Sequence, residues 1–525
     1  MIDAKYGVMM LQMTAENKSK MIYWASGIVS ICGIIFEVLF GALGSYILGD
    51  GVKQYTLTIS IFLTGMGIGA SFSERITKNL ILSFVWIEFL VAIIGGFSSF
   101  TMFGITAFLP GGSDALFLYM VTFIIGALTG VELPVLIRKA NDLGVALNKS
   151  TARVLFSDYA GGLIGGLLFV FLLRPEFGMV KTAFFVGLIN LSVALFILWM
   201  FREEIKGWKK HGFAGISIGV VLIGGLFFGE ELAFSFEQKM YRDPIIYMDE
   251  SKYQKIVLTK DQGDTRLFLN GGLQFSSTDE YRYHEVLVHP VMSQVDSHDQ
   301  ILVLGGGDGL VVRELLKYND IQNITLVDLD PAVVNLAKNN HHLLNLNENA
   351  LSHDKVHIIH QDAFQFLEST TRQYDVIIVD LPDPNNEGLN KLYTWEFYSL
   401  IRNRLEPTGA TMVQATSPVF APKVYWTISK TIESTGMKVE NFHVDIPSFG
   451  NWGFVMAGRN PVRTEELVVE VETKFLTSEM IIGLTKFGKD EDSYIEEKGN
   501  LLVLKPNTLI DPHLIQKYED AWNNY

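Results

Sequence analysis

Long apolar runs dominate the first 230 residues of the chain. Each run is long enough to cross a bilayer as a helix, which needs about 20 apolar residues. The first is longer than the apolar core of a signal peptide, and no small-residue cleavage site follows it, so it should remain as an anchor. The pattern therefore predicts a transmembrane bundle of about seven helices. The runs lie at residues 22–48, 55–73, 79–108, 113–137, 154–173, 179–201 and 212–229.

Basic residues cluster after every second run, at residues 75–78, 138–153 and 202–210. By the positive-inside rule these loops are cytoplasmic. That places the N-terminus inside and, with seven spans, the rest of the chain outside. One irregular segment would reverse the result, and the 79–108 run, with two glycines in its middle, is long enough to contain one.

Four acidic residues fall within the predicted spans: Glu37, Glu88, Glu132 and Asp158. An uncompensated charge there costs at least a few kcal/mol, so each should face the bundle interior or a partner. One interpretation is a cation site. The other is ion pairing near helix ends, for instance with Arg138 or Arg174, together with close packing through the glycines at 161, 162, 165 and 166.

The hydrophobic period changes after residue 240. Alternating positions from about 245 to 280 predict a small antiparallel β domain. A buried strand at 301–304, a glycine turn at 305–309, a helix and a strand ending at Asp328 then form a βαβ unit, which indicates an α/β Rossmann-like, methyltransferase-like domain. The predicted domains are a transmembrane domain at 1–235, the small β domain at 240–285, the Rossmann-like domain at 286–460 and a C-terminal extension at 461–525.

The composition of the chain limits the kinds of ligand and partner that it can bind. The formal net charge is −15, and all of the acidic excess lies after residue 230. That argues against a nucleic-acid partner, which needs a basic surface, and suits cationic substrates. Cys32 is the single cysteine, so the chain cannot form an internal disulfide or a thiolate metal cluster. Since no metal-ligand spacing such as HExxH occurs either, we predict no metal site.

Glycines at 305, 306, 307 and 309 would let the backbone pass close to a ligand at the end of a strand. An acidic residue ending the next strand can accept both ribose hydroxyls, and Asp328 fits that role. Asp362 follows the strand after it. Its carboxylate could bind the exocyclic amine of an adenine or cap the helix that begins there, and the sequence favours neither.

The fourth strand ends in Asp380-Leu381-Pro382-Asp383-Pro384. A phosphate site would need positive charge there, whereas a primary amine needs carboxylates to hold it and to take its proton. An ordinary Asp-Pro turn is the alternative for Asp383. Asp308, in the glycine turn, would repel a ligand carboxylate. Together these residues predict a pocket for cations.

These motifs resemble those of the spermidine synthases, or polyamine aminopropyltransferases. The resemblance covers about 245–458. The helical half resembles the multi-pass membrane variety of the family. It rests on YQKIVL, LNGGLQFSSTDEYRYHE, LVLGGGDGLVVREL, LVDLD, QDAFQFL, YDVIIVDLPDP, LYTWEFY and QATSP, and in the helical half on GVELPVLIRKA and DYAGGLIGG.

The resemblance implies that decarboxylated S-adenosylmethionine donates its aminopropyl group to putrescine or a related amine. The products would be spermidine or an analogue and methylthioadenosine, with no metal or redox cofactor. By motif position, Gln254 and Asp328 would hold the ribose, Asp362 the adenine and Asp308 the donor's ammonium. Asp380 would be the catalytic residue that orients and deprotonates the attacking amine.

On the acceptor side, the resemblance implies that Gln274, Tyr283 and Asp383 bind the amine. His284 and Glu285 would be contacts or supporting structure. The chain departs from the family here: Leu381-Pro382 replaces small hydroxyl residues, Thr416 stands where many members carry an acid, and Phe449 stands where a tyrosine is common. Putrescine as the acceptor is therefore less secure than the donor.

Two other functions stay open. A methyltransferase would share the nucleoside-binding positions, although Asp308 and the paired acids speak against it. A membrane polyamine sensor or transporter would bind without catalysing and use the membrane acids as a cation path. We expect a multi-pass protein of the cell membrane. Helix counting places the catalytic domain outside, but the expected donor is made in the cytoplasm, so we favour the cytoplasmic face. Dimerisation is common in the resembled family.

Overall fold

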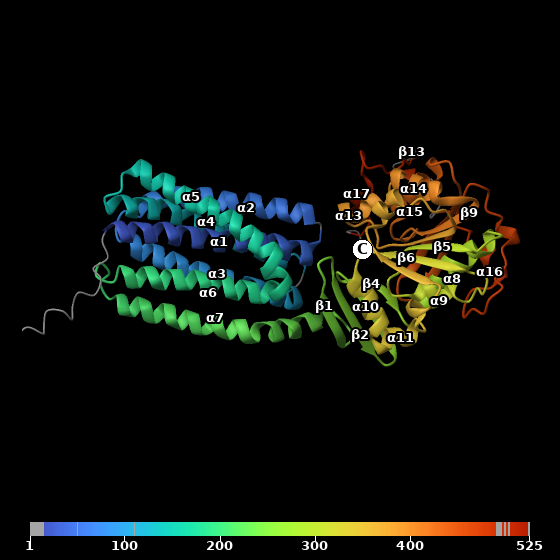
Figure 1. The fold of residues 1–525 in the computed structure, drawn as a ribbon, viewed down its shortest axis with the longest axis horizontal. Coiled ribbons are helices and arrows are strands. Elements are labelled where there is room, and N and C mark those ends of the chain that lie inside the picture. Colours follow the sequence, from blue (N-terminus) through green and yellow to red (C-terminus); the bar gives the residue numbers. More distant parts are fainter. Residues whose placement is uncertain are drawn as a thin grey trace, which may run out of the picture. The chain divides into compact units, whose positions relative to one another are not determined.

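The chain forms two compact units, Met1–Arg242 and Asp243–Tyr525. The computed structural model describes residues 15–49, 51–109, 111–489, 496–497, 500–501 and 504–522. The first unit is built of long helices and the second carries the sheets (Figure 1).

Seven long helices make up the described part of the first unit, one for each predicted apolar run. By length and composition, six continuous helical stretches of the described chain could cross a membrane, and the longest, Leu147–Met200, contains both α5 and α6. The helices are α1 (Ala15–Leu48), α2 (Gly51–Phe72), α3 (Leu80–Phe108), α4 (Ser113–Asp142), α5 (Leu147–Leu168), α6 (Arg174–Met200) and α7 (Trp208–Glu237).

The irregular segment of the bundle lies between α5 and α6. A π-helical turn spans Phe169–Leu173, and Gly178 follows with φ of +64° and an extended ψ. These breaks turn the chain, so that α5 and α6 run in opposite directions (Figure 1). The expectation of an irregularity in 79–108 was wrong, because α3 is continuous there. A Cβ at Gly95 would lie 2.5 Å from the Phe36 ring, which indicates a packing role for this glycine.

Glycines on α5 let that helix approach α1. A Cβ at Gly161 would lie 2.2 Å from the carbonyl oxygen of Gly27, and one at Gly165 would lie 2.7 Å from that of Ile31. The predicted close packing is therefore confirmed at these two positions. Gly166 has nothing within 4 Å of its added Cβ and does not share this role.

Two of the acids predicted to face the bundle interior lie together in it. Glu88 of α3 and Glu132 of α4 are buried, and their carboxyl groups are electrostatic neighbours. The Nδ2 of Asn190 donates to Glu88 over 2.6 Å. Arg138, expected as an ion-pair partner, instead donates to backbone carbonyls, among them that of Ser73 at 2.7 Å. No ion pair with a basic side chain is seen at either acid in the described part of the bundle.

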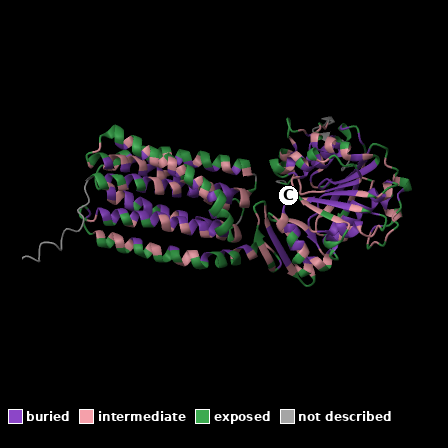
Figure 2. Cartoon of the chain, in the orientation of Figure 1, coloured by how far each residue is buried: buried purple, intermediate pink, exposed green. Residues whose placement is uncertain are grey.

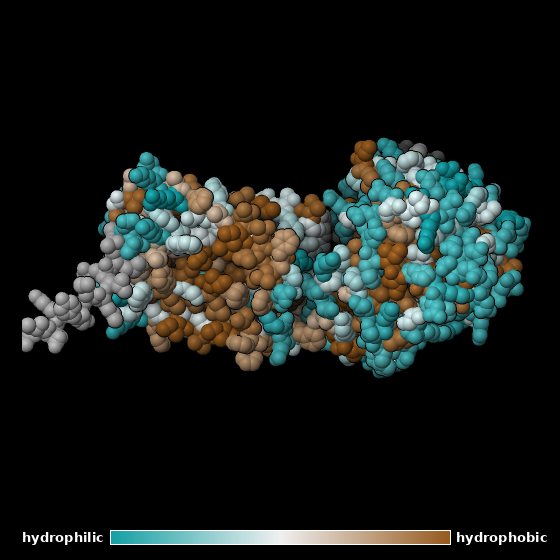
Figure 3. Space-filling view, viewed as in Figure 1, coloured by the Kyte–Doolittle hydropathy of each residue, from teal (hydrophilic) through white to brown (hydrophobic). Residues whose placement is uncertain are grey.

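Apolar side chains also cover the outside of the helices. Exposed examples are Leu63, Phe156, Leu163, Phe171, Phe213, Val220 and Phe227. Figure 3 shows the visible surface of this unit as largely hydrophobic, with hydrophilic atoms gathered toward helix ends, whereas the surface of the second unit is mostly hydrophilic. A surface of this kind is unstable in water unless lipid or protein covers it.

The second unit begins with a small antiparallel sheet, as predicted. Its strands lie in the order β1-β2-β3-β4. They are β1 (Ile245–Glu250), β2 (Lys255–Asp261), β3 (Asp264–Leu269) and β4 (Gly272–Ser276). The next helix, α8 (Glu280–Gln294), runs across the predicted boundary at 285 and packs on the larger sheet.

The larger sheet has seven strands in the order β10-β11-β9-β8-β5-β6-β7. The five strands from β9 to β7 are parallel, and β10 and β11 are antiparallel additions at one edge. The strands are β5 (Gln300–Gly305), β6 (Asn323–Asp328), β7 (Val356–His360), β8 (Tyr374–Asp380), β9 (Leu405–Gln414), β10 (Lys438–Ile446) and β11 (Gly450–Gly458). This is the doubly wound, Rossmann-like architecture expected from the sequence.

The core of this unit lies on both faces of the sheet. Along β5, Ile301 and Val303 join one hydrophobic cluster while Leu302 and Leu304 join the other, so the strand is buried throughout (Figure 2). One face is covered by α8, α9 (Leu310–Leu315) and α10 (Pro331–Asn339), and the other by α12 (Ala363–Ser369), α14 (Trp395–Arg404) and α15 (Pro422–Ser434). With both faces covered, polar chemistry is left to the carboxyl ends of the parallel strands.

Candidate active site

The glycine turn after β5 brings the backbone against the neighbouring strands. A Cβ at Gly305 would lie 1.9 Å from the carbonyl oxygen of Asp380, and one at Gly307 would lie 2.5 Å from Oδ2 of Asp328. Gly305 and Gly309 also have φ of +85° and +86°, which other residues rarely adopt. Glycine is therefore required here, and the Gly307 N–H donates to Asp328 over 3.0 Å.

Asp328 ends β6 beside this turn. Its other oxygen accepts the N–H of Asp330 at 2.9 Å, and burial raises its pKa to about 6. Gln254, predicted to share the ribose with Asp328, donates instead to Asp330 over 3.1 Å, as does the Ser251 hydroxyl over 2.6 Å. Sequence analysis missed Asp330. Its place directly before Pro331, as the N-cap of α10, was the available signal.

Asp362 follows β7 and caps α12. One oxygen accepts the N–H of Gln365 at 3.1 Å, so the predicted capping role is confirmed. The other accepts the Lys391 ammonium at 2.6 Å. This lysine, which sequence analysis also missed, precedes the LYTWEFY motif. An adenine amino group would therefore meet a carboxylate that is already held in place from two sides.

Asp380 ends β8 and accepts the Tyr283 hydroxyl at 2.6 Å. Burial raises the pKa of Asp380, while His284 and the Tyr283 bond oppose that rise. Asp308 lies close enough to interact with Asp380. Burial raises the pKa of Asp308 to about 6. The charge of His284 lowers this pKa, and the charge of Asp380 raises it further. Asp308, predicted to bind the donor, and Asp380, predicted to bind the attacking amine, are thus electrostatic neighbours.

His284 lies between these acids and Glu280. Its Nδ1 bonds to Oε2 of Glu280 at 2.8 Å. Burial alone would lower its pKa, but the bond and charge of Glu280 outweigh burial and raise the pKa to about 9. The ring is therefore an imidazolium at neutral pH. It places one positive charge near Asp308 and Asp380 and counters part of their mutual repulsion.

Behind His284 lies an ion-pair network that the sequence did not reveal. Arg313 donates to both oxygens of Glu280 at 2.9 Å and pairs with Glu314, which also bonds His289 at 3.0 Å. All four side chains are buried. An arginine and a glutamate among the apolar residues of α9 were the only sequence signal. The network anchors α9, and with it the glycine turn, to α8.

Glu285 has a supporting role. Its carboxylate accepts the backbone N–H groups of Lys474, Phe475 and Leu476 at 2.6, 2.9 and 2.8 Å. These residues belong to the C-terminal extension, so Glu285 ties that extension to α8. Of the two roles that the sequence left open for this residue, these three bonds support the structural one.

Asp383 lies three residues beyond Asp380 and accepts three side-chain donors. They are the hydroxyls of Thr416 at 2.9 Å and Tyr518 at 3.0 Å and the amide of Gln414 at 3.2 Å. Burial raises the pKa of Asp383, and the three bonds oppose that rise. The bond from the Asn385 N–H to the Asp383 carbonyl shows that the alternative, an Asp-Pro turn, exists as well.

Of the other two predicted acceptor residues, Tyr283 contacts Asp380 and Gln274, within the described residues, does not. Tyr283 stacks against Phe449 with ring centroids 6.5 Å apart, so Phe449 supplies a ring without a hydroxyl at this wall. Gln274 lies on β4, and its amide donates to the carbonyl of Gly272 at 3.1 Å. The described structure does not join it by a hydrogen bond to Asp380 or Asp383.

The carboxyl ends of four adjacent parallel strands thus carry acids. This arrangement can hold hydroxyl and ammonium groups and remove a proton from an amine, and it disfavours phosphate or carboxylate ligands. Across the described residues, no group of three His, Cys, Asp or Glu stands close enough to hold a metal ion.

Comparisons with known proteins agree with this chemistry. Residues 280–466 match the family model described as the spermine/spermidine synthase domain. The polyamine aminopropyltransferase of Oceanobacillus iheyensis is 69% identical over 98% of this chain and 100% of its own. Polyamine aminopropyltransferase 1 of Streptomyces coelicolor is 37% identical over 94% and 93% of the two chains. A crystal structure of spermidine synthase with the transition-state analogue AdoDATO matches 47% of this chain and 87% of that one, at 21% identity and a TM-score of 0.44.

The fold and the acids at the strand ends define a Rossmann-like domain that can hold hydroxyl and ammonium groups. The full-length relatives make the class specific. The chain belongs to the polyamine aminopropyltransferase family, and it is an enzyme of aminopropyl transfer. The comparisons thereby favour the predicted reaction over the methyltransferase alternative.

Proposed function

We propose that this enzyme transfers the aminopropyl group of decarboxylated S-adenosylmethionine to putrescine, giving spermidine and methylthioadenosine. The observation that carries the proposal is the nearness of Asp308, in the turn after β5, to Asp380, at the end of the adjacent β8, with His284 close to both. One carboxylate can hold the donor's ammonium while the other meets the attacking amine. A donor with a terminal carboxylate would be repelled by Asp308.

On the donor side, Asp328 would accept the ribose hydroxyls. Gln254 would act beside it through Asp330, since its amide already bonds that residue. Asp362 would accept the adenine amino group while Lys391 holds its second oxygen. No metal or redox cofactor enters the scheme, since the sulfonium already activates the carbon that is attacked.

In the reaction, the neutral amine of the acceptor attacks the carbon bound to the sulfonium sulfur. A C–N bond forms, the C–S bond breaks with its electron pair going to sulfur, and the amine proton passes to Asp380. An amine attacks only when neutral and close, so Asp380 supplies both deprotonation and orientation. The Tyr283 hydroxyl fixes the Asp380 carboxylate for this step.

On the acceptor side, Asp383 would bind the amine, and the stacked rings of Tyr283 and Phe449 would flank its carbon chain. Gln274 keeps its predicted acceptor role only as a proposal, because its amide faces Gly272. Putrescine is proposed as the acceptor that the family resemblance implies. Thr416, which bonds Asp383, is a departure from that family, so a panel of amines tests the acceptor.

The test is product analysis with the purified full chain in detergent, decarboxylated S-adenosylmethionine and a panel of diamines and polyamines. We expect methylthioadenosine and spermidine, with Asp380→Asn lowering kcat by roughly 100- to 10,000-fold while nucleoside binding persists. Product with another amine only would replace putrescine as the acceptor. No product with any amine, but tight polyamine binding, would favour the sensor or transporter hypothesis.

We also propose that the helical unit crosses the cell membrane. Each of its seven helices has at least 22 residues, or about 33 Å of rise, against a hydrocarbon thickness of about 30 Å. The outward-facing apolar residues would then contact lipid. Flotation of the full chain with liposomes, resistant to high salt and alkaline carbonate, is the expected result, and extraction by either would contradict it.

For the catalytic unit we propose the cytoplasmic face, where the donor is made. Helix counting points the other way. The basic clusters at 75–78, 138–153 and 202–210 favour an internal N-terminus, and seven crossings would then place the catalytic unit outside. Reporters fused after Tyr525 test the topology. Alkaline phosphatase activity would overturn the proposal, whereas fluorescence of a cytoplasmic reporter would support it.

Dimerisation stays a prediction, which light scattering of the detergent-solubilised chain checks.

A further inference from the structure

The C-terminal extension reaches the acceptor end of the site. The family match ends at residue 466, yet Tyr518, on α17 (Leu514–Trp522), donates its hydroxyl to Asp383 over 3.0 Å. Tyr518 is half-buried against the hydrophobic cluster that covers α12, α14 and α15. An element outside the matched domain thus supplies a hydrogen-bond donor to a residue of the proposed acceptor site.

The segment before α17 is firmly held. Asn507 is fully buried, and its Nδ2 donates to Asn390 Oδ1 at 3.1 Å and to the Tyr393 carbonyl at 3.0 Å. Its backbone N–H bonds the Thr431 hydroxyl, and its carbonyl accepts the Trp395 N–H at 2.8 Å. Such a fully satisfied buried amide specifies one docking position.

The helix itself is fixed at three further points. Leu514 is completely buried, Lys517 donates to the Thr427 hydroxyl at 2.9 Å, and Trp522 packs on Phe420 with centroids 5.9 Å apart. Tyr518 lies between these contacts. Its position is set by the docked helix rather than by Asp383 alone.

The bond from Tyr518 matters because of the acceptor capacity of Asp383. A carboxylate has about four lone-pair sites. Oδ2 of Asp383 already takes Thr416 and Tyr518, and Oδ1 takes Gln414. Only one direction, on Oδ1, is left for an ammonium group. Without the Tyr518 hydroxyl, one direction on Oδ2 would be free as well, and the carboxylate could turn about its bond.

We propose that Tyr518 is a specificity-determining residue: by occupying Oδ2 of Asp383, it fixes the direction in which the acceptor's ammonium binds and so selects the length of the amine. The proposal rests on the proposed acceptor role of Asp383. It assigns the C-terminal helix a part in substrate selection, which the matched domain alone does not contain.

The test compares Tyr518→Phe with the parent enzyme in the full chain. The ring and its packing persist, so the variant loses one hydroxyl. We expect KM for putrescine to rise about ten-fold and KM for the nucleoside donor to stay unchanged, while the lost bond to a charged group lowers the Tm by several degrees. The ratio of kcat/KM between putrescine and diamines one methylene shorter or longer should shrink by several-fold.

Lys517→Met is the matched control, because it removes another hydrogen bond of α17, the one to Thr427, without touching Asp383. It should leave the diamine ratio as in the parent. An unchanged putrescine KM and ratio in Tyr518→Phe would overturn the inference, as would equal changes in Lys517→Met. If the parent chain itself formed no product, the proposed function would have failed, whereas an active parent with an unaffected variant refutes only the role of Tyr518.

Discussion

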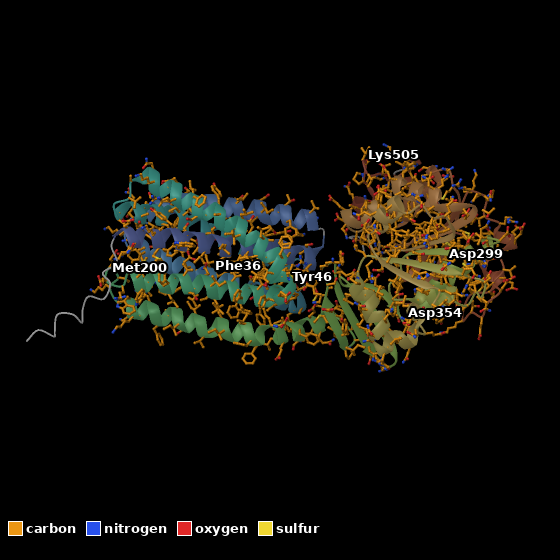
Figure 4. All side chains as sticks on the ribbon, viewed as in Figure 1. Phe36, Tyr46, Met200, Asp299, Asp354 and Lys505 are labelled. Atoms are coloured by element: carbon orange, nitrogen blue, oxygen red, sulfur yellow. The ribbon has the colours of Figure 1, made fainter. Side chains whose placement is uncertain are left out.

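In the sheet-bearing unit, Glu280 accepts two bonds from Arg313 and one from His284, whereas in the helical unit Glu88 and Glu132 face each other with an asparagine as neighbour. Both sets of acids are buried. The first set sits in a fixed environment of donors and cations. The second set of acids lies near Cys32. Cys32 is one helical turn from Phe36, and Figure 4 shows Phe36 midway along the bundle.

The contrast shows two uses of a buried acid. Where charges are paired, the acid fixes the backbone of a catalytic turn, and its ionised form is part of the fold. Where two acids lie close together without a basic partner, their charges would repel each other unless a cation entered from outside. The paired acids should therefore be costly to alter, and the facing acids should not.

The largest effect is expected for Arg313→Met. This change leaves Glu280 and Glu314 buried without their shared cation, and breaking such a pair costs about 3–5 kcal/mol of unfolding free energy. Denaturant unfolding of the second unit, followed by tyrosine and tryptophan fluorescence, measures it. The control is Arg463→Met, whose ion pair with Glu466 is exposed and should change stability by less than about 1 kcal/mol. Equal effects of the two changes would contradict the comparison.

A smaller loss is expected for Glu285→Gln. Three backbone N–H groups bond the carboxylate, and a neutral amide has only one oxygen to accept them. Stability should fall by about 1–3 kcal/mol. Hydrogen exchange of the Lys474, Phe475 and Leu476 amides should accelerate, while Glu433→Gln, at an exposed pair with Lys430, should leave exchange there unaltered. Unchanged protection of those three amides would refute the supporting role.

Asp308 offers a comparison within the second unit, because its proposed role is to bind the ammonium group of the donor. Its pKa is raised from 3.8 to about 6. Lowering the pH through about 6 protonates it, so affinity for the donor's ammonium should fall by up to about ten-fold per pH unit below that value. Titration calorimetry with decarboxylated S-adenosylmethionine measures this decline.

Methylthioadenosine separates Asp308 from Asp328, whose pKa burial also raises to about 6. It lacks the ammonium, so its affinity should depend less on pH than that of the donor. Asp308→Asn should make the two ligands alike in pH dependence. A donor affinity that stays constant from pH 7 to pH 5 would show that neither acid needs its charge.

Much of this architecture could be predicted from sequence because it depends on local periodicity. The seven apolar runs, the small sheet and the βαβ unit ending at Asp328 each carry their own signal over ten to twenty residues. The acids at the strand ends were found for the same reason, since a strand followed by a polar turn puts its carboxyl end at the ligand edge.

What the sequence missed depends on contacts between distant segments. Arg313 and Glu280 are 33 residues apart, and Tyr518 is 135 residues from Asp383. No spacing rule connects such pairs. The break near Gly178 was missed because a π turn inside an apolar run leaves the hydrophobic pattern intact.

The smallest effect is expected for Glu132→Gln in the helical unit. The substitution replaces one of two facing carboxyl groups by an amide that can donate to Glu88, so it removes repulsion and keeps the volume. Thermal unfolding in detergent should change by less than about 1 kcal/mol, or shift toward higher stability, and aminopropyl transfer should be unaffected. Glu285→Gln is the same substitution at a fully partnered acid. If Glu132→Gln destabilised the chain as much, Glu132 would be held by a bound cation, and the cation path in the helical unit would become the stronger hypothesis.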